Sequence, residues 1–368
     1  NGTRVENRFG VRPALKLDLS KVAFDSTTKT FSLITKYPLW VGGIQVTSAN
    51  ATDTSHSSWS YDRDSKTLTL NGYNNNGNVG DKKAGIYAEE DLDIVTVGTN
   101  DVSNNSNGSY DRAINVNGTL IFKGNGTMNA KGGKRSIVAN NVTIESGTVK
   151  VSDGDYGICA EVDDVTINGG VVNGNGNQIG LQSNHDVIIN NGTVTASSTS
   201  GNSSAIKATN DVIIKKGTVT VKHTGSGGSG ILAENGVTIQ GGSVETTGYV
   251  GINAGSVTIK AGSVKATGTL AGIAGANGVD ISGGTIDATA TASGDQSYGI
   301  YGNEVIIKGG NVTASGFGNG ILINVKNSIS GIGWTNTAGT EGKASIPIST
   351  EGQSLNYKKV QFPDAKIA

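Results

Sequence analysis

Three aspartates stand at matched positions in successive segments of the chain and could together hold a cation. Asp164, Asp186 and Asp211 each precede a short aliphatic run that begins with valine. If these runs are neighbouring strands, the carboxylates stack ~4.8 Å apart, and like charges that close repel unless a cation or a proton relieves them. Oxygen ligands of this kind suit calcium, which makes calcium the candidate metal. The competing interpretation is that aspartate simply makes a good turn just before a strand.

A second set of candidate residues is aromatic. These rings precede a phrase of a small residue and isoleucine that recurs along the chain: Tyr110, Tyr156, Tyr249 and Tyr298, with Phe317 nearby. If equivalent loops stack, the rings form a strip along one edge of the molecule. Aromatic faces suit the apolar faces of sugar rings, and the Asn, Asp and Ser neighbours can hydrogen-bond to hydroxyl groups. These residues are therefore candidate ligand-binding residues, and the alternative is that each ring only shields its own loop.

Residues for catalysis are harder to assemble. Hydrolysis of a glycan needs a pair of carboxyl groups at a set separation. A polysaccharide lyase of this fold would instead need an exposed lysine or arginine as its base, and none accompanies the aspartates in a repeated way. The histidines His56, His185 and His223 share no metal-binding spacing. His185 adjoins Asp186, but neighbours along a strand point to opposite faces. The sequence therefore favours a protein that is not an enzyme and assigns no catalytic residue.

Composition and charge exclude other classes of partner. The formal net charge is −1, from 29 basic and 30 acidic residues that are interspersed. No basic stripe is available to neutralise phosphates, so nucleic acid is not expected as a partner. No apolar run is long enough to span a bilayer, so membrane insertion is not expected either. Cys159 is the single cysteine, which excludes a disulfide within the chain and a cysteine-rich metal site.

The elements that must position these residues are visible as a repeat. A phrase of four positions recurs from Gly85 to Gly320. It consists of a small residue, Ile or Leu, a variable residue and usually another small residue. Successive recurrences start 28, 23, 21, 23, 25, 25, 21, 21, 27 and 21 residues apart. A period in the twenties with variable loops is typical of a solenoid. Between these phrases, apolar residues alternate with Thr, Lys, Glu or Asn, which is the period-two pattern of β-strands.

Aligning the units gives vertical columns of aliphatic residues. One column consists of Val142, Val165, Val187, Val212, Val237, Val257, Val279 and Val305, and the next of Ile144, Ile167, Ile189, Ile214, Ile239, Ile259, Ile281 and Ile307. A third consists of Val149, Val172, Val194, Val219, Val244, Val264, Ile286 and Val312. The pattern predicts an all-β protein, a right-handed single-stranded parallel β-helix of about ten coils with three short strands each.

Both ends of such a stack expose strand edges, so a β cap is expected at each end. Residues 37–84 are predicted to form the N-terminal cap, 85–334 the parallel β-helix repeats, and 335–368 the C-terminal cap. Residues 1–36 are expected to hold the tail of a preceding domain, a linker and the first strands. Trp40 and Trp59 are interpreted as cap packing rather than ligand contacts. The chain starts without methionine or a signal peptide, which predicts that it is cut from a longer precursor.

Several of these segments resemble a known family. The stretch Tyr37–Ser48, Trp59-Ser60-Tyr61, the "GIYA" and "VTIxGGTV" units and the closing Tyr357–Pro363 resemble surface proteins of Gram-positive gut anaerobes. Those proteins are described as carbohydrate-binding-domain-containing or right-handed parallel β-helix proteins. Residues Phe9–Leu19 resemble the tail of a small domain that often precedes the solenoid in them. The resemblance implies an extracellular location, at the cell surface or secreted.

Taken together, the residues and the resemblance predict a non-catalytic extracellular module that is glycan-binding or adhesin-like. Its expected partner is a polysaccharide or a host or cell-wall glycan. The alternatives are a polysaccharide lyase or glycoside hydrolase of the β-helix type, and a purely structural stalk. No cofactor is expected apart from the candidate calcium, and the sequence does not indicate an oligomeric state.

Overall fold

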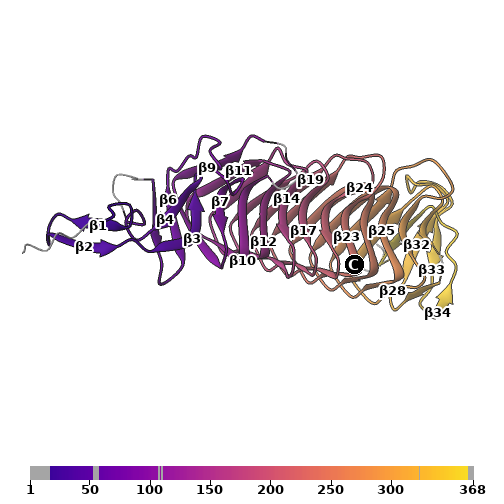
Figure 1. Cartoon of the computed structure of the whole chain (residues 1–368). Helices are drawn as coiled ribbons and strands as arrows, with labels where there is room; N and C mark the ends of the chain where they lie inside the picture. Colours follow the sequence, from indigo (N-terminus) through magenta and orange to yellow (C-terminus); the bar gives the residue numbers. More distant parts are fainter. Residues whose placement is uncertain (1–16, 53–57, 107, 109–110, 323, 364–368) are drawn as a thin grey trace, which may run out of the picture.

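The protein is an elongated column in which successive turns of the chain, built from β-strands, stack on one another (Figure 1). The computed structural model describes residues 17–52, 58–106, 108, 111–322 and 324–363. In these residues the structure is all β-strand, loop and turn, without a helix. Accordingly, this part of the chain offers no helix of the length and apolarity needed to cross a membrane. The predicted β-solenoid is confirmed, and it has about 11 turns.

Parallel strands from successive turns form three faces of the column. Face 1 consists of β7 (Ala84–Ala88), the first parts of β10 (Arg112–Gly124) and β12 (Arg135–Ile144), β14 (Tyr156–Ala160), β17 (Ile179–Ser183), β20 (Ser204–Ala208), the first part of β23 (Ser229–Ile239), the middle parts of β24 (Ser243–Ile259) and β25 (Ser263–Ile281), β27 (Tyr298–Gly302) and β30 (Asn319–Leu322).

Face 2 consists of β6 (Thr67–Asn71), β8 (Leu92–Val97), the later parts of β10 and β12, β15 (Val165–Ile167), β18 (Val187–Ile189), β21 (Asp211–Ile214), the ends of β23, β24 and β25, β28 (Val305–Ile307) and β31 (Val325–Asn327). Face 3 consists of β9 (Thr99–Asn104), β11 (Thr127–Gly132), β13 (Thr148–Ser152), β16 (Val171–Asn175), β19 (Thr193–Ser198), β22 (Thr218–His223), the starts of β24 and β25, β26 (Thr285–Ala290) and β29 (Asn311–Ser315).

The aliphatic columns read from the sequence line the interior. On face 2, Val165 is paired with Val187, and Ile167 with Ile189. On face 3, Val172 is paired with Val194. All these side chains are fully buried, because alternation along each strand sends every second residue inward. The observed number of about 11 turns agrees with the predicted number of about ten coils, because each of the eleven recurrences of the first phrase opens a turn.

A glycine turns the chain from face 2 to face 3 in nearly every unit. Gly192 has φ +106° and Gly217 has φ +93°, a backbone conformation that L side chains rarely adopt. A Cβ at Gly217 would lie 2.4 Å from the carbonyl oxygen of Gly192 in the turn below. The same oxygen accepts a hydrogen bond of 2.9 Å from the Thr218 amide. Glycine is needed here because the corner backbones of consecutive turns touch.

In some turns one long strand takes the place of the three short strands that were predicted. β24 and β25 run without interruption from face 3 through face 1 to face 2, and they pair along their whole lengths with only two register shifts. The two turns have nearly equal lengths, so inter-strand hydrogen bonds continue around their corners.

Antiparallel strands close the N-terminal end. β3 (Lys36–Val41) runs antiparallel to β7 and to β4 (Ile44–Thr47), and β5 (Trp59–Asp62) forms a hairpin with β6. Trp59 and Tyr61 are buried beneath the first turn, as cap residues should be. Trp40, by contrast, is half-buried and lies beside Tyr87 on the outside of face 1. A separate antiparallel pair, β1 (Val22–Asp25) and β2 (Thr30–Leu33), precedes this end.

The C-terminal end is closed in the same way. β35 (Lys359–Phe362) runs antiparallel to both β29 and β32 (Gly331–Trp334), and β34 (Ser349–Gln353) runs antiparallel to β31. β33 (Ala344–Ile346) pairs with β32. Val360 and Phe362 are fully buried and Trp334 nearly so, which covers the last aliphatic layer.

Candidate functional site

A groove opens on face 1 near the middle of the solenoid. It has a volume of about 480 Å³ and is lined by Tyr156, Gln178, Ile179, Ser200, Asn202, Ser203, Ser204, Lys207 and Leu232. The lining combines an aromatic ring and two aliphatic side chains with hydroxyl and amide groups. This is the mixture that binds a sugar, whose ring has apolar faces and a rim of hydroxyl groups.

A change in loop length creates the groove. The chain takes nine residues from Val172 on face 3 to Leu181 on face 1, and twelve from Val194 to Ile206 in the next turn. The longer corner, which includes Ser200 to Ser203, therefore stands out beyond the shorter corner of the turn before it. The sequence analysis named Tyr156 but missed the other residues of this groove, although the increase of the interval between units from 23 to 25 residues marks it.

Tyr156 is held firmly at one end of the groove. Its hydroxyl donates a hydrogen bond of 2.8 Å to Gln178 Oε1, and the guanidinium of Arg135 lies 5.1 Å from its ring centroid. Arg135 is in turn paired with Glu161. A ring that is fixed in this way loses little conformational entropy when a ligand packs against it.

The predicted aromatic residues do not gather into one strip. Tyr156 and Tyr298 share a register position on face 1, but β17, β20, β23, β24 and β25 lie between them. Six steps of ~4.8 Å put them roughly 29 Å apart along the axis. Tyr249 is exposed, but it precedes Val250, the residue of its turn that is paired in register on face 1. Tyr110 lies outside the described residues.

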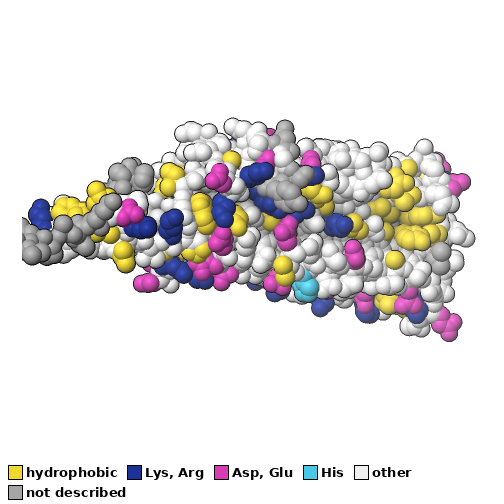
Figure 2. Space-filling model, viewed as in Figure 1, with side chains coloured by type: hydrophobic (Ala, Val, Ile, Leu, Met, Phe, Trp, Pro, Cys, Tyr) yellow, Lys and Arg dark blue, Asp and Glu magenta, His cyan; other side chains and the backbone are white. Residues whose placement is uncertain are grey.

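A second aromatic group lies near the C-terminal end, where Figure 2 shows exposed hydrophobic side chains gathered. Tyr298 stacks on Tyr301 with ring centroids 5.9 Å apart, and the Lys358 ammonium lies 5.1 Å from the Phe317 ring centroid. Tyr301 and Phe317 are 40% and 39% exposed. The sequence analysis missed Tyr301, which occupies the variable third position of the recurring phrase, as Tyr87 does.

A third aromatic group was missed at the N-terminal end. The rings of Trp40 and Tyr87 lie 5.6 Å apart, and the Lys82 ammonium lies 4.1 Å and 4.6 Å from their centroids. Lys82 also forms an ion pair of 2.7 Å with Glu89. A paired cation therefore already occupies these ring faces.

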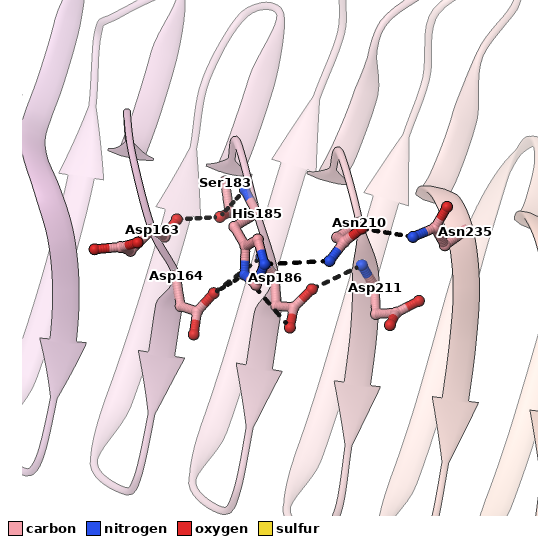
Figure 3. Close-up of polar contacts among 8 residues, drawn as sticks. All are labelled: Asp163, Asp164, Ser183, His185, Asp186, Asn210, Asp211 and Asn235. Carbon is pink, nitrogen blue, oxygen red and sulfur yellow. Dashed lines mark hydrogen bonds and ion pairs between the residues drawn. The ribbon is translucent and has the colours of Figure 1, made fainter.

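The three aspartates form a ladder with a histidine in it (Figure 3). Oδ1 of Asp164 accepts a hydrogen bond of 3.1 Å from the Asp186 amide, and Oδ1 of Asp186 accepts one of 3.0 Å from the Asp211 amide. His185 Nδ1 lies 2.7 Å from Asp164 Oδ1 and 3.6 Å from Asp186 Oδ2. The expectation that His185 points away from Asp186 is wrong, because His185 lies in the turn before β18, where strand alternation does not apply.

The histidine supplies the charge compensation that the aspartates need. The hydrogen bond to Asp164 and the nearby charge of Asp186 raise the pKa of His185 above its usual value of 6.5. When protonated, His185 is the counter-ion of both carboxylates. Together with the backbone amides, it reduces the repulsion that suggested a bound cation.

Three residues of this ladder lie close enough together, among the described residues, to be able to hold a metal ion. One ligand atom each from Asp164, His185 and Asp186 lie within 4.8 Å of one another. An imidazole nitrogen beside carboxylates suits a transition metal better than calcium, which prefers six to eight oxygen ligands. Asp211 is not part of the set, so the predicted calcium site of three aspartates fits the geometry poorly.

Cys159 is not a reactive nucleophile. Its side chain faces outward from β14 yet is buried beneath its neighbours. Burial raises the pKa of the Cys159 thiol to about 12, so the thiolate is scarce at neutral pH.

These features define a class of protein: a parallel β-solenoid that presents an open, largely polar groove on one of its outer faces. Residues 44–248, more than half of the chain, match the family described as carbohydrate-binding domain-containing protein, and the chain belongs to that family. The groove lies wholly within the matched residues, whereas Tyr298, Tyr301 and Phe317 lie beyond them. No curated protein and no solved structure matches the sequence.

Proposed function

We propose that the protein is a non-catalytic module that binds a glycan in the groove beside Tyr156, on the outside of the cell that makes it. The observation that carries this proposal is the groove itself, which lies in the family-matched residues and combines an immobilised tyrosine with hydroxyl and amide groups. The extracellular location is supported by the resemblance to surface proteins of Gram-positive gut anaerobes. That resemblance also suggests an adhesin-like role at the cell surface.

The way the groove is built indicates how a sugar would bind. The Tyr156 ring, Ile179 and Leu232 offer apolar surface for one face of the sugar. Ser200, Asn202 and Ser203 come from the protruding corner and offer hydrogen-bonding groups for its hydroxyls. Because the lining residues come from successive turns along the solenoid axis, a sugar within a longer chain is expected to fit as well as a terminal one.

Calorimetric titration after a glycan-array screen tests the proposal. Tyr156→Ala and Asn202→Ala are expected to weaken binding of the selected glycan at least tenfold, since each removes a contact in the groove. Tyr249→Ala is the matched control, because Tyr249 is an exposed tyrosine on face 1 outside the groove, and it should bind normally. Binding that survives both groove variants, or that Tyr249→Ala abolishes, would place the site elsewhere.

Two other functions predict different results. A structural stalk retains no glycan on the array. A lyase or hydrolase of the β-helix type shortens the bound polysaccharide, and a lyase also produces an unsaturated product that absorbs in the ultraviolet. We expect retention without shortening.

A further inference from the structure

Lys207 is the one charged residue among the nine that line the groove. It lies half-buried on β20, and its partners in register are Gln182 on β17 and Leu232 on β23. The remaining lining residues are hydroxyl, amide, aromatic or aliphatic. A ligand in the groove therefore meets a positive charge and no carboxylate from the lining.

Several lysines on the outside of other turns form ion pairs with carboxylates of a neighbouring turn. Lys265 forms an ion pair of 2.8 Å with Glu245, its partner in register on the turn below. Lys123 reaches Asp93 at 2.7 Å, and Lys308 reaches Asp280 at 2.5 Å, again across neighbouring turns. No ion pair in the described part of the chain joins Lys207 to an acidic residue, because Gln182 and Leu232 stand where a carboxylate would be.

A buried acceptor lies next to this lysine. Oε1 of Gln182 is buried and has no hydrogen-bond partner among the described residues. A buried oxygen without a donor is unfavourable, and a hydroxyl or ammonium donor relieves it. Gln182, which lies in register with Lys207 on the turn below, therefore places an uncharged side chain and no carboxylate beside the ammonium.

We propose that the groove selects sugars that carry a carboxylate, with Lys207 as the counter-ion. This inference rests on the proposed function, since it names the chemical class of the glycan bound there. The carboxylate of a uronic or sialic acid accepts charge-assisted hydrogen bonds from the ammonium, which are stronger than those from a neutral hydroxyl. Half-burial of Lys207 limits screening of its charge by salt.

The test compares charged and neutral forms of the same sugars by calorimetry on the whole chain. One arm uses trigalacturonate and its methyl ester, and the other uses sialyllactose and its methyl ester, which separates a uronate from a sialate source. In at least one arm the charged form is expected to bind the wild type ten times more tightly or better. Lys207→Gln should reduce that ratio to about one, and Lys207→Arg should retain most of it. Lys222→Gln, at an exposed lysine on face 3, is the control for loss of one charge.

The outcomes separate the two proposals. If neutral and charged sugars bind the wild type equally well, the selectivity for carboxylates is wrong while glycan binding stands. A ratio that Lys207→Gln leaves unchanged also overturns the inference, because the charge is then recognised elsewhere. If none of these sugars binds and a wider array also retains no glycan, neutral or acidic, both proposals fall.

Discussion

The glycine corner allows a prediction whose size follows from the geometry. At Gly217 an alanine meets two costs at once: a φ of +93° and a Cβ 2.4 Å from the carbonyl oxygen of Gly192. The positive φ costs about 1–2 kcal/mol for a residue with a Cβ. Relieving the contact separates the two turns and weakens the hydrogen bond from Thr218 to that same oxygen, for about another 1 kcal/mol. Gly217→Ala should therefore destabilise the protein by about 2–3 kcal/mol.

Two other glycines separate these costs. Gly72 has φ +66°, but a Cβ there would meet no atom within 4 Å, so Gly72→Ala carries the backbone cost alone. Gly294 has neither a positive φ nor a neighbour within 4 Å of a Cβ, so Gly294→Ala should be neutral or stabilising by less than about 1 kcal/mol. The expected order of destabilisation is Gly217→Ala, then Gly72→Ala, then Gly294→Ala.

Denaturant unfolding gives the overall free-energy changes, and amide hydrogen exchange shows where they arise. For Gly217→Ala, protection should fall most at Thr218 and in the adjoining turns, since each turn contacts only its neighbours. The reasoning is refuted if Gly217→Ala is no more destabilising than Gly72→Ala. The corners would then be able to move apart without cost, and glycine would be there for its φ alone.

Three further predictions concern the core and the aspartate ladder. Ile206→Ala removes a fully buried side chain and should lower the free energy of unfolding by about 2–5 kcal/mol. Amide hydrogen exchange should become faster around the turn that holds Ile206. A uniform change along the solenoid would argue against turns that contact only their neighbours. The raised pKa of His185 means that its ion pair stabilises the protein fully below pH 6.5 and that this contribution is lost as pH rises through the folded-state pKa. An NMR titration of His185 and melting temperatures against pH measure both effects, and His185→Asn should remove the pH dependence. Calcium should not raise the melting temperature of the wild type near pH 6, where the imidazolium already offsets one of the two charges of Asp164 and Asp186. A clear increase that Asp186→Ala abolishes would restore the calcium site.

The architecture could be predicted because its cause is local. Alternation along each strand sends Val187 and Ile189 inward whatever the rest of the chain does, and the unit length places Val165 and Ile167 beneath them. The same reasoning located the buried columns and the hairpin from Trp59 to Leu70. It also located the aspartate ladder, since Asp164, Asp186 and Asp211 hold fixed positions before the strands of face 2.

The candidate site could not be predicted in the same way, because it depends on differences between turns. The groove exists only because the corner before Ile206 is longer than the corner before Leu181. Unequal corners also mean that residues at the same distance before a strand are not equivalent in space, and for this reason Tyr249 falls out of register with Tyr156. The contact of His185 with Asp164 depends on a turn conformation that strand periodicity does not describe.

The antiparallel strands at the two ends have a consequence for how the molecule meets copies of itself. Each internal turn is a template on which an identical turn can grow, so a bare column would extend from molecule to molecule as a fibre. β3 and β35 reverse the strand direction at the first and last positions, and neither edge continues the repeating pattern. The two caps thus fix the length of the column, and deleting both the β3–β4 segment and the β33–β35 segment should allow the molecules to polymerise end to end.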